Sequence, residues 1–356
     1  MTNTINLMKR NQFIWAGLIA AGLLAPQLAQ AQTDPATNRL TFSARFALNI
    51  SAKFRGTAPI VVPTAPRTAP HGENYNYDDG YVLPDVSGSG DGSSWYVGYD
   101  DSASQVNTGN NTILLSRSTG AATLHSGEMD DEPSLGAELN YSRQVGVTKH
   151  FRYGFEAAAN YLNISLKGGG YGVRGQRVTD AYQYSDGTTP PTATPGSPYQ
   201  GSFEGPNFMV NTTPISSTTS QGTVATVTGS RSLDADLWGA RLGPYLEYYL
   251  HDKVSVSLSG GLAAGWLDNS VSWNETVNFT SGGSLPADIG RGSDQELLWG
   301  FYLAANAYWR LSDHWSAAGS VQYQNLGTYE HTFGTRKAEL DLSSSLFFTL
   351  GVSYNF

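Results

Sequence analysis

Apolar and polar residues alternate with a period of two over long stretches of this chain. In residues 41–54, every second position is apolar: Phe42, Ala44, Phe46, Leu48, Ile50, Ala52 and Phe54. A strand directs such residues to one face, whereas a helix scatters them around its circumference. The pattern therefore predicts a β-strand with one apolar and one polar face.

The same alternation recurs in further segments, at residues 134–145, 150–165, 232–249, 254–268, 295–310, 315–326 and 340–356. The connections between these segments alternate in length. Tight turns are expected at 146–149, 250–253 and 311–314, and longer connections at 55–133, 167–231, 270–293 and 328–339. The pattern predicts an all-β protein, an up-and-down antiparallel meander of eight strands with both chain ends on the short-turn side.

The composition narrows the class of protein further. The chain has a net charge of −9, contains no Cys, and has only 14% charged residues. The negative charge argues against a nucleic-acid binder, which would normally carry a basic face. The absence of Cys excludes disulfides, thiolate metal sites and cysteine nucleophiles.

Aromatic residues near the strand ends distinguish two kinds of β-protein. A soluble β-sandwich or a lipocalin-like barrel also alternates, but its apolar face points to a packed core. Here the apolar faces carry large aromatic residues toward their ends: Tyr153, Trp238, Tyr248, Trp266, Trp309, Trp315 and Tyr354. The opposite faces are rich in Gly, Ser and Asn and would make a poor core. This distribution favours strands that cross a membrane between two aromatic girdles.

The first residues have the pattern of an export signal. Lys9 and Arg10 precede an apolar run at 13–24, and Ala29 and Ala31 fit the small positions before a cleavage site. The alternative is a membrane anchor helix, but the run of about 12 residues is shorter than the roughly 20 that a spanning helix needs. We expect a signal peptide at 1–31, cleaved after Ala31, and a mature barrel at 32–356 with long extracellular loops at 55–133 and 167–231.

Together, the eight strands, the export signal and the aromatic C-terminus resemble the small outer-membrane β-barrels of Gram-negative bacteria, of the OmpA, OmpX and OmpW type. The resemblance covers residues 39–56 and about 134–356, apart from the long loops. It implies a transmembrane barrel in the bacterial outer membrane, with both termini periplasmic. Its partners would be outer-membrane lipids and lipopolysaccharide, periplasmic chaperones and the barrel-assembly machinery. We expect a monomer. Two departures are the unusually long first two loops and the lack of a following peptidoglycan-binding domain.

The alternation continues to the last residue of the chain. Val352, Tyr354 and Phe356 resemble the C-terminal signal by which barrel proteins are recognised for membrane insertion. We expect the last strand to close the barrel against the first, with its apolar residues facing lipid. Phe347 is the exception, because its position in the alternation places an aromatic ring inside, where it would act as a plug.

Charged residues on the inward faces predict an interior network. An eight-stranded barrel is just wide enough to be filled by side chains. Arg45, Glu138, Glu156 and Arg241 should lie at similar heights on neighbouring strands. Buried charges require partners, so these four are expected to pair. Further inward candidates are Glu247, Glu296 and Arg310.

The loops contain weaker candidates for chemistry. Calcium favours several oxygen ligands, and six aspartates of the first loop could supply them: Asp78, Asp79, Asp85, Asp91, Asp100 and Asp101. No EF-hand spacing is present, so we expect an acidic surface without a specific ion, and no metal or cofactor. The second loop, rich in Pro, Thr, Gly and Ser, is not expected to build a core.

Two histidines have acidic neighbours in the sequence that make them candidates for catalysis. Glu330 and His331 are adjacent in the fourth loop, and His125 lies near a group of acidic residues: Glu128, Asp130, Asp131 and Glu132. Neither has a spacing that specifies a reaction, so we expect no enzyme. The predicted role is structural, or recognition and adhesion through the extracellular loops. The alternatives are a narrow channel or uptake path for small or hydrophobic solutes and, less favoured, an outer-membrane lipid or peptide hydrolase.

Overall fold

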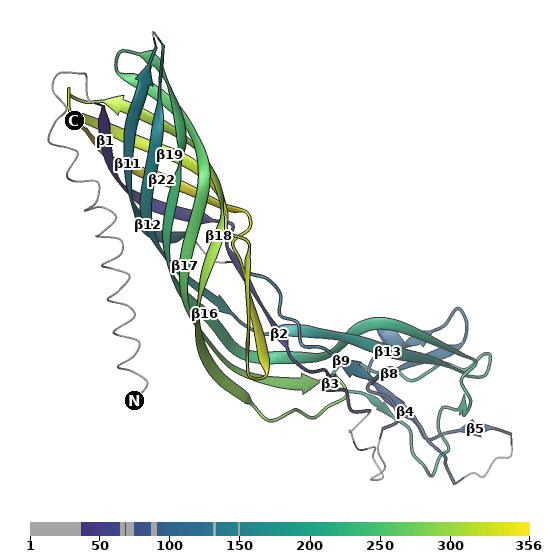
Figure 1. The fold of residues 1–356 in the computed structure, drawn as a ribbon. Helices are drawn as coiled ribbons and strands as arrows, with labels where there is room; N and C mark the ends of the chain where they lie inside the picture. Colours follow the sequence, from purple (N-terminus) through teal and green to yellow (C-terminus); the bar gives the residue numbers. More distant parts are fainter. Residues whose placement is uncertain (1–36, 65–67, 69–74, 87–90, 131–132, 149) are drawn as a thin grey trace, which may run out of the picture.

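The computed structural model describes residues 37–64, 68, 75–86, 91–130, 133–148 and 150–356. It has two parts, a ring of long strands and an arm that leans away from it (Figure 1). The predicted signal peptide at 1–31 lies outside the described residues. Within the described part of the chain, no helix is long and apolar enough to cross a membrane. The prediction of an all-β, antiparallel protein is confirmed.

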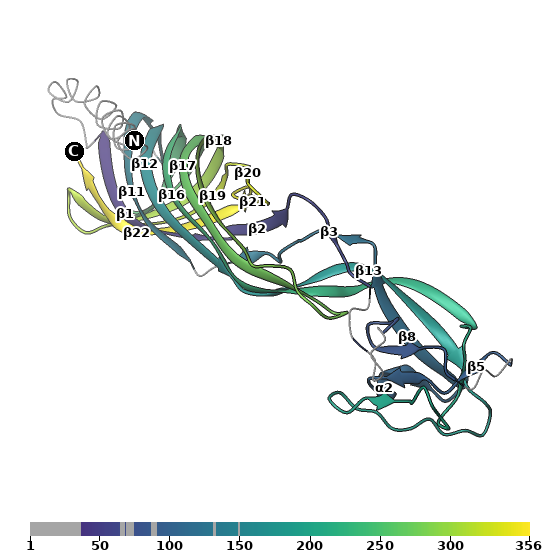
Figure 2. The same ribbon diagram turned by 90° about the horizontal axis from the view of Figure 1, so that it is seen from below.

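The ring consists of strands that each pair antiparallel with two neighbours. These strands are β1 (Asn38–Leu48), β11 (Ser134–Val147), β12 (Phe151–Gly168), β16 (Ser216–His251), β17 (Val254–Phe279), β18 (Asp288–Arg310), β19 (Trp315–Asn325) and β22 (Ser345–Asn355). Neighbours in this order pair with one another, and β22 pairs with β1. The pairing therefore returns to its starting strand, as Figures 1 and 2 show.

Side chains of the ring alternate between its interior and its outer surface. In β22, Leu350 is 67% exposed, whereas the neighbouring polar residues Thr349 and Ser353 are buried. The outward residues of the ring are mainly apolar, and many of the inward residues at the end that holds the chain termini are polar. This is the reverse of a water-soluble fold, in which large apolar side chains are buried.

The first predicted strand, 41–54, divides into two. Asn49 has a positive φ of 63°, a left-handed conformation that Asn tolerates better than most residues. The kink ends β1 and reverses the alternation, so that Phe42 faces outward but three later apolar residues of the predicted face are buried: Ile50, Ala52 and Phe54. The expectation of one continuous apolar face was wrong beyond Leu48.

Ala52 and Phe54 belong to a small sheet at the end of the ring opposite the chain termini, which we call the lid sheet, and Ile50 directly precedes it. It contains β10 (Met129–Asp130), β2 (Ser51–Gly56), β21 (Arg336–Asp341) and β20 (Thr328–Phe333), in that order. The predicted last strand, 340–356, is thus also divided, between β21 and β22. Apolar residues of the lid sheet and of the adjoining end of the ring form one core, which includes Phe54, Tyr329, Leu340, Leu237 and Leu267.

The arm is an extension of the ring's own strands. β16 and β17 continue beyond the ring, and β16 pairs with β13 (Tyr171–Gln183), which pairs with β8 (Thr112–Thr119). The remaining elements are β7 (Val106–Asn107), β4 (Gly80–Val82), β6 (Val97–Tyr99), β14 (Tyr199–Gln200), β5 (Ser93–Ser94), β15 (Val210–Asn211), β3 (Ile60–Val61), β9 (Ala121–Ala122) and the single helical turn α2 (Ser102–Gln105).

The arm corrects the expectation that residues 167–231 build no core. Tyr and branched aliphatic residues from both long connections pack together, among them Tyr77, Tyr99, Ile113, Leu115, Tyr182 and Val210. A second cluster near the base of the arm contains Val173, Val224 and Val277. Pro and Thr dominate the composition of the second connection, but these few large residues suffice because the arm strands hold them on one side.

Candidate functional site

Inside the ring, four charged residues form one network of ion pairs. Arg241 donates hydrogen bonds to Glu138 at 2.6 Å and to Glu156 at 2.8 Å. Arg45 donates to Glu138 at 2.5 Å and to the side-chain oxygen of Gln324 at 2.8 Å. All of these side chains are almost fully buried. The structure thus brings together the four residues that the alternation placed at similar heights.

Aromatic rings complete the surroundings of this network. The Arg45 guanidinium lies 3.7 Å from the ring centre of Phe347, and the Tyr302 hydroxyl donates to Glu156 at 3.0 Å. A cation over an aromatic face is stabilised by the ring quadrupole, and more so away from water. Phe347 is therefore buried inside as the sequence indicates, and it covers the cation of the network.

Glu247 belongs to a separate cluster nearer the chain termini. Its carboxylate accepts hydrogen bonds from Arg39 at 2.9 Å, from Arg152 at 3.0 Å and from Ser255 at 2.6 Å. Arg39 also lies over the ring of Tyr308, at 3.8 Å. Neither arginine was predicted from the sequence to be a partner of Glu247. Arg39 lies an even number of residues before Arg45 and therefore shares its inward face, but the predicted strand begins only at residue 41.

Glu296 and Arg310 do not join the interior. Both are exposed, which corrects the prediction that they point into a closed lumen. β19 pairs with β18 only from Phe301 onward, so Glu296 lies on a part of β18 beyond the closed ring. Arg310 is at the opposite end of the strand, where its side chain donates to the carbonyl of Asp252.

A third buried cluster lies where the ring meets the lid sheet. Glu275 accepts from Arg231 at 3.0 Å and pairs with Arg336 at 3.0 Å. Arg336 also pairs with Asp288 at 3.1 Å. These contacts hold the β20–β21 hairpin against β17 and β18. They were missed because Glu275, Asp288 and Arg336 lie in predicted loops, although the alternation of β17 in fact continues to Phe279.

The interior of the ring is packed with side chains. A cavity beside the first network, between residues such as Ser43, Asn140 and Asn306, has a volume of about 10 Å³, close to the least that holds one water. Between the network and the lid sheet the ring is filled by the apolar core, in which Leu162 and Leu237 are fully buried. Around the network and in this core, the described side chains therefore leave little space for a solute.

The outward surface of the ring carries an apolar band between aromatic residues. Tyr248 and Trp238 on β16, and Trp309 and Trp299 on β18, are exposed and about ten residues apart. At roughly 3.3 Å per residue and a strand tilt of about 40°, this separation corresponds to a height of about 25 Å. Beyond Trp238 the next outward residue is Asp236, so the band ends abruptly.

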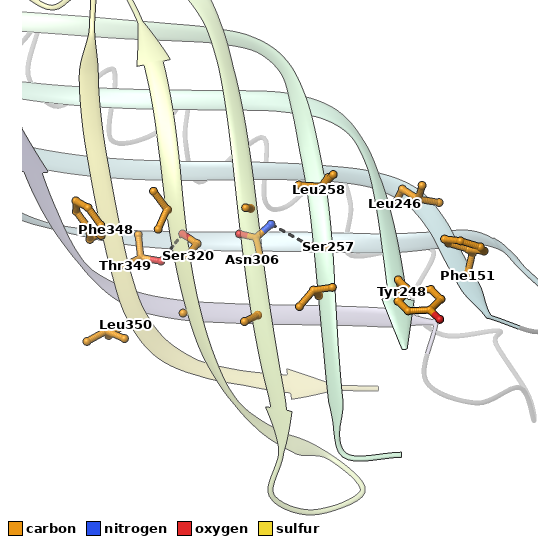
Figure 3. Close-up of a pocket in the computed structure, with 15 residues that line it drawn as sticks. Phe151, Leu246, Tyr248, Ser257, Leu258, Asn306, Ser320, Phe348, Thr349 and Leu350 are labelled. Atoms are coloured by element: carbon orange, nitrogen blue, oxygen red, sulfur yellow. Dashed lines mark hydrogen bonds between the residues drawn. The ribbon is translucent and has the colours of Figure 1, made fainter. Parts of the chain in front are cut away.

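One part of this band is hollowed. Small residues of β18 and β19, Ala305, Ala307 and Gly319, lie between large side chains that include Leu246 on one side and Phe348 on the other. Figure 3 shows the larger residues around an open space, which has a volume of about 740 Å³. Its lining is almost wholly apolar, and it opens to the outside of the ring rather than to the interior.

In the arm, two aspartates cover one edge of the sheet. Asp79 accepts a hydrogen bond from the backbone N–H of Ser116 at 2.7 Å, and Asp78 accepts from the backbone N–H of Ser118 at 2.7 Å. Both serines are in β8, whose unpaired edge is thereby capped. Arg177 donates to Asp79 at 3.2 Å. These two predicted calcium candidates thus have a structural role, and the described residues contain no group of three or more potential metal ligands.

The stability of the arm should depend on pH through Asp79. Burial raises the pKa of Asp79 to about 6, against about 3.9 for an ordinary Asp. Between these values the folded arm holds a proton that the unfolded chain has released, so stability falls as pH rises through this window. We expect the thermal midpoint of the arm, followed by near-ultraviolet circular dichroism of its tyrosines, to drop from about pH 4.5 to 7. Asp79→Asn should lessen the drop; an equal drop in this variant would contradict the assignment.

Residues at and near the two candidate catalytic histidines form ion pairs and hydrogen bonds with neighbouring strands. His331 Nδ1 lies 3.0 Å from Asp294, which also accepts a hydrogen bond from Tyr329 at 3.0 Å. Glu330 pairs with Lys337 on the adjacent strand. Near His125, Glu128 pairs with Lys53. Of the acidic residues considered with His125, Asp131 and Glu132 lie outside the described residues.

Comparison with known proteins gives matches of structure only. No protein-family model matches the chain, and no curated protein matches its sequence. Solved structures similar to it include the attachment invasion locus protein Ail of Yersinia pestis, the outer membrane protease OmpT of Escherichia coli and the outer membrane protein OprG of Pseudomonas aeruginosa. Their identities are 8%, 8% and 10%, and their TM-scores 0.28, 0.34 and 0.32; the matches cover 90%, 92% and 92% of this chain and 99% of each structure. All three TM-scores are below 0.5, so neither a class nor an activity of this chain follows from these similarities.

Proposed function

We propose that this chain is an integral protein of the bacterial outer membrane whose extracellular arm recognises surfaces or partners outside the cell. In this proposal the ring is an eight-stranded transmembrane barrel with both chain termini on the periplasmic side. Outer-membrane lipids and lipopolysaccharide surround it, and periplasmic chaperones and the barrel-assembly machinery insert it. In this proposal the chain has no enzymatic activity and needs no cofactor.

The apolar band supports the membrane location. A closed ring of strands satisfies its backbone hydrogen bonds internally, which lipid requires. The height of about 25 Å between the aromatic residues matches the apolar band of outer-membrane barrels. Arg39 and Glu247 then lie near the periplasmic end, and the lid sheet and arm lie outside the outer leaflet.

The observation that carries the recognition role is the continuity of β16 and β17. Both strands run from the apolar band into the arm without interruption, so the barrel holds the arm as a fixed extension. The packed interior gives the channel alternative less support, because a solute path needs an open or opening lumen. Recognition through a rigid surface module therefore accounts for more of the molecule than transport does.

Two measurements on the intact chain test this proposal. Planar bilayers containing the purified protein should show no steady conductance. Cells that display the protein should bind glycan arrays or immobilised extracellular-matrix proteins more strongly than cells displaying a variant with residues 62–122 and 172–224 replaced by short Gly-Ser linkers. Equal surface levels of the two proteins serve as the control. Stable conductance, or equal binding by both proteins, would overturn the recognition role.

Deleting Phe356 should impair insertion into the membrane. Its backbone N–H and carbonyl each pair with Asn38 at 3.0 Å, and its ring stacks on Tyr354. We expect the deletion to lower the amount of folded, protease-resistant protein in the outer membrane several-fold, whereas Phe356→Trp, which keeps an aromatic end, should insert normally. Undiminished insertion of the deletion variant would refute the role of Phe356 as a signal.

A further inference from the structure

An open strand edge lies on the arm, at residues 216–222 of β16. One side of this segment pairs with β13. On the other side, β17 pairs with β16 only from Ala225 onward. Residues 216–221 are all exposed, and no described residue hydrogen-bonds to this outer side. Every second residue of such an edge directs its backbone N–H and carbonyl into solvent.

The sequence of this edge lacks the usual devices against pairing. Natural edges are protected by charged residues, Pro, bulges or covering segments. The segment reads Ser-Ser-Thr-Thr-Ser-Gln-Gly and contains neither charge nor Pro. The opposite border of the same sheet is protected, since Asp78 and Asp79 cap the backbone of β8. One edge of the arm is therefore blocked and the other is left able to accept a strand.

We propose that the open edge binds the same edge of a second copy of this chain, as an antiparallel pair about a two-fold axis. Centred on Thr219, this pair sets Thr219 opposite Thr219, Thr218 opposite Ser220, and Ser217 opposite Gln221. Hydroxyl and amide pairs of this kind stabilise neighbouring strands, and no like charges oppose one another. The segment is thus complementary to itself, as a two-fold interface requires.

A second copy is favoured over a different partner because the edge is uncharged. It offers no charge pattern with which to select another chain, whereas copies in one membrane present the same edge at high local concentration. The arm projects away from the ring (Figures 1 and 2), which leaves its edge clear of the apolar band. The inference rests on the proposed extracellular position of the arm but on no particular ligand. It departs from the monomer expected from the sequence.

Cysteine cross-linking tests this pairing on the full chain. The protein has no Cys, so Thr219→Cys introduces a single thiol. Residues directly opposite in an antiparallel pair have Cα atoms about 4.5–5.5 Å apart, within the range of a disulfide. We expect covalent dimers after oxidation of the purified protein in lipid vesicles. Thr226→Cys is the matched control, because Thr226 is exposed on the same strand but pairs with neighbours on both sides. A dominant link at Ser217→Cys or Gln221→Cys would keep the pairing and shift its register.

A charge at the centre of the edge should abolish the dimer. Thr219→Lys places two ammonium groups opposite one another, and we expect at least a tenfold rise in the dissociation constant of the dimer, measured by light scattering in detergent. Thr226→Lys should leave it unchanged. Cross-linking at none of the three edge positions above the Thr226→Cys level, or an unchanged dimer with Thr219→Lys, overturns the inference. Either result leaves conductance and surface binding as separate tests of the recognition role.

Discussion

Replacing Arg241 by Ala is expected to lower the unfolding free energy of the ring by about 3–5 kcal/mol, the usual cost of removing one partner from a buried ion pair. Arg241 is the only one of the four network residues that contacts both carboxylates, Glu138 and Glu156. Without it, Glu156 retains the Tyr302 hydroxyl but loses its cation, and Glu138 retains only Arg45. Urea unfolding in lipid vesicles, followed by tryptophan fluorescence, measures the loss.

Arg143 provides a matched control for this experiment. It is exposed on β11 and takes no part in the interior clusters, so Arg143→Ala should change stability by less than about 0.5 kcal/mol. The double variant Arg241→Ala with Glu156→Gln should be less destabilised than the sum of the single changes, because neutralising Glu156 removes an unpaired buried charge. A loss below about 1 kcal/mol for Arg241→Ala would mean that the network does not stabilise the barrel.

Replacing Leu262 by Arg is expected to destabilise the inserted protein by about 2–4 kcal/mol, the cost of a cation on the lipid face near the middle of a barrel. Leu262 is 72% exposed on β17 and pairs with Leu242 and Phe301 within the apolar band. On a water-exposed surface, the same substitution would be nearly neutral. The result therefore separates a membrane barrel from a soluble one.

The measurement is again unfolding in lipid vesicles, with the arm as the internal comparison. Thr226→Arg changes an exposed residue of β16 that lies in the arm, and it should leave stability within about 0.5 kcal/mol. Equal, small effects of the two arginine substitutions would argue that the outward apolar face of the ring does not contact lipid.

Much of the interior network was predictable because strand geometry is regular. Side chains alternate strictly between two faces, and height increases by a nearly constant rise per residue. The alternation places four residues on the inside of the ring, and their distances in sequence from the short turns place them at similar heights: Arg45, Glu138, Glu156 and Arg241. The same rules place Glu296 on the inside, and they fail there because β19 does not extend along β18 before Phe301, which leaves that part of β18 with a neighbour, β17, on one side only.

Other features depend on contacts between segments far apart in the sequence. The reversal of faces at Asn49 follows from a single left-handed residue, and nothing in the alternation of Phe42 to Phe54 signals it. The buried contacts of Glu275 with Arg231 and Arg336 require the lid sheet to fold back on the ring. The folded arm could not be predicted from the composition of the loops. Its core consists of scattered residues such as Tyr77 and Tyr182, which form no periodic pattern in the sequence.

The sequence by itself determined the class of the protein, the paths of most ring strands, the inward and outward faces and the core of the charge network. These properties follow from a local period of two, which needs no knowledge of distant residues. Only the tertiary structure decided the filling of the ring beside the lid sheet, the lid sheet itself, the arm and its open edge at residues 216–222. Each depends on which strands lie side by side and where their pairing ends. The alternation within one segment does not specify its register with a segment far away in the sequence.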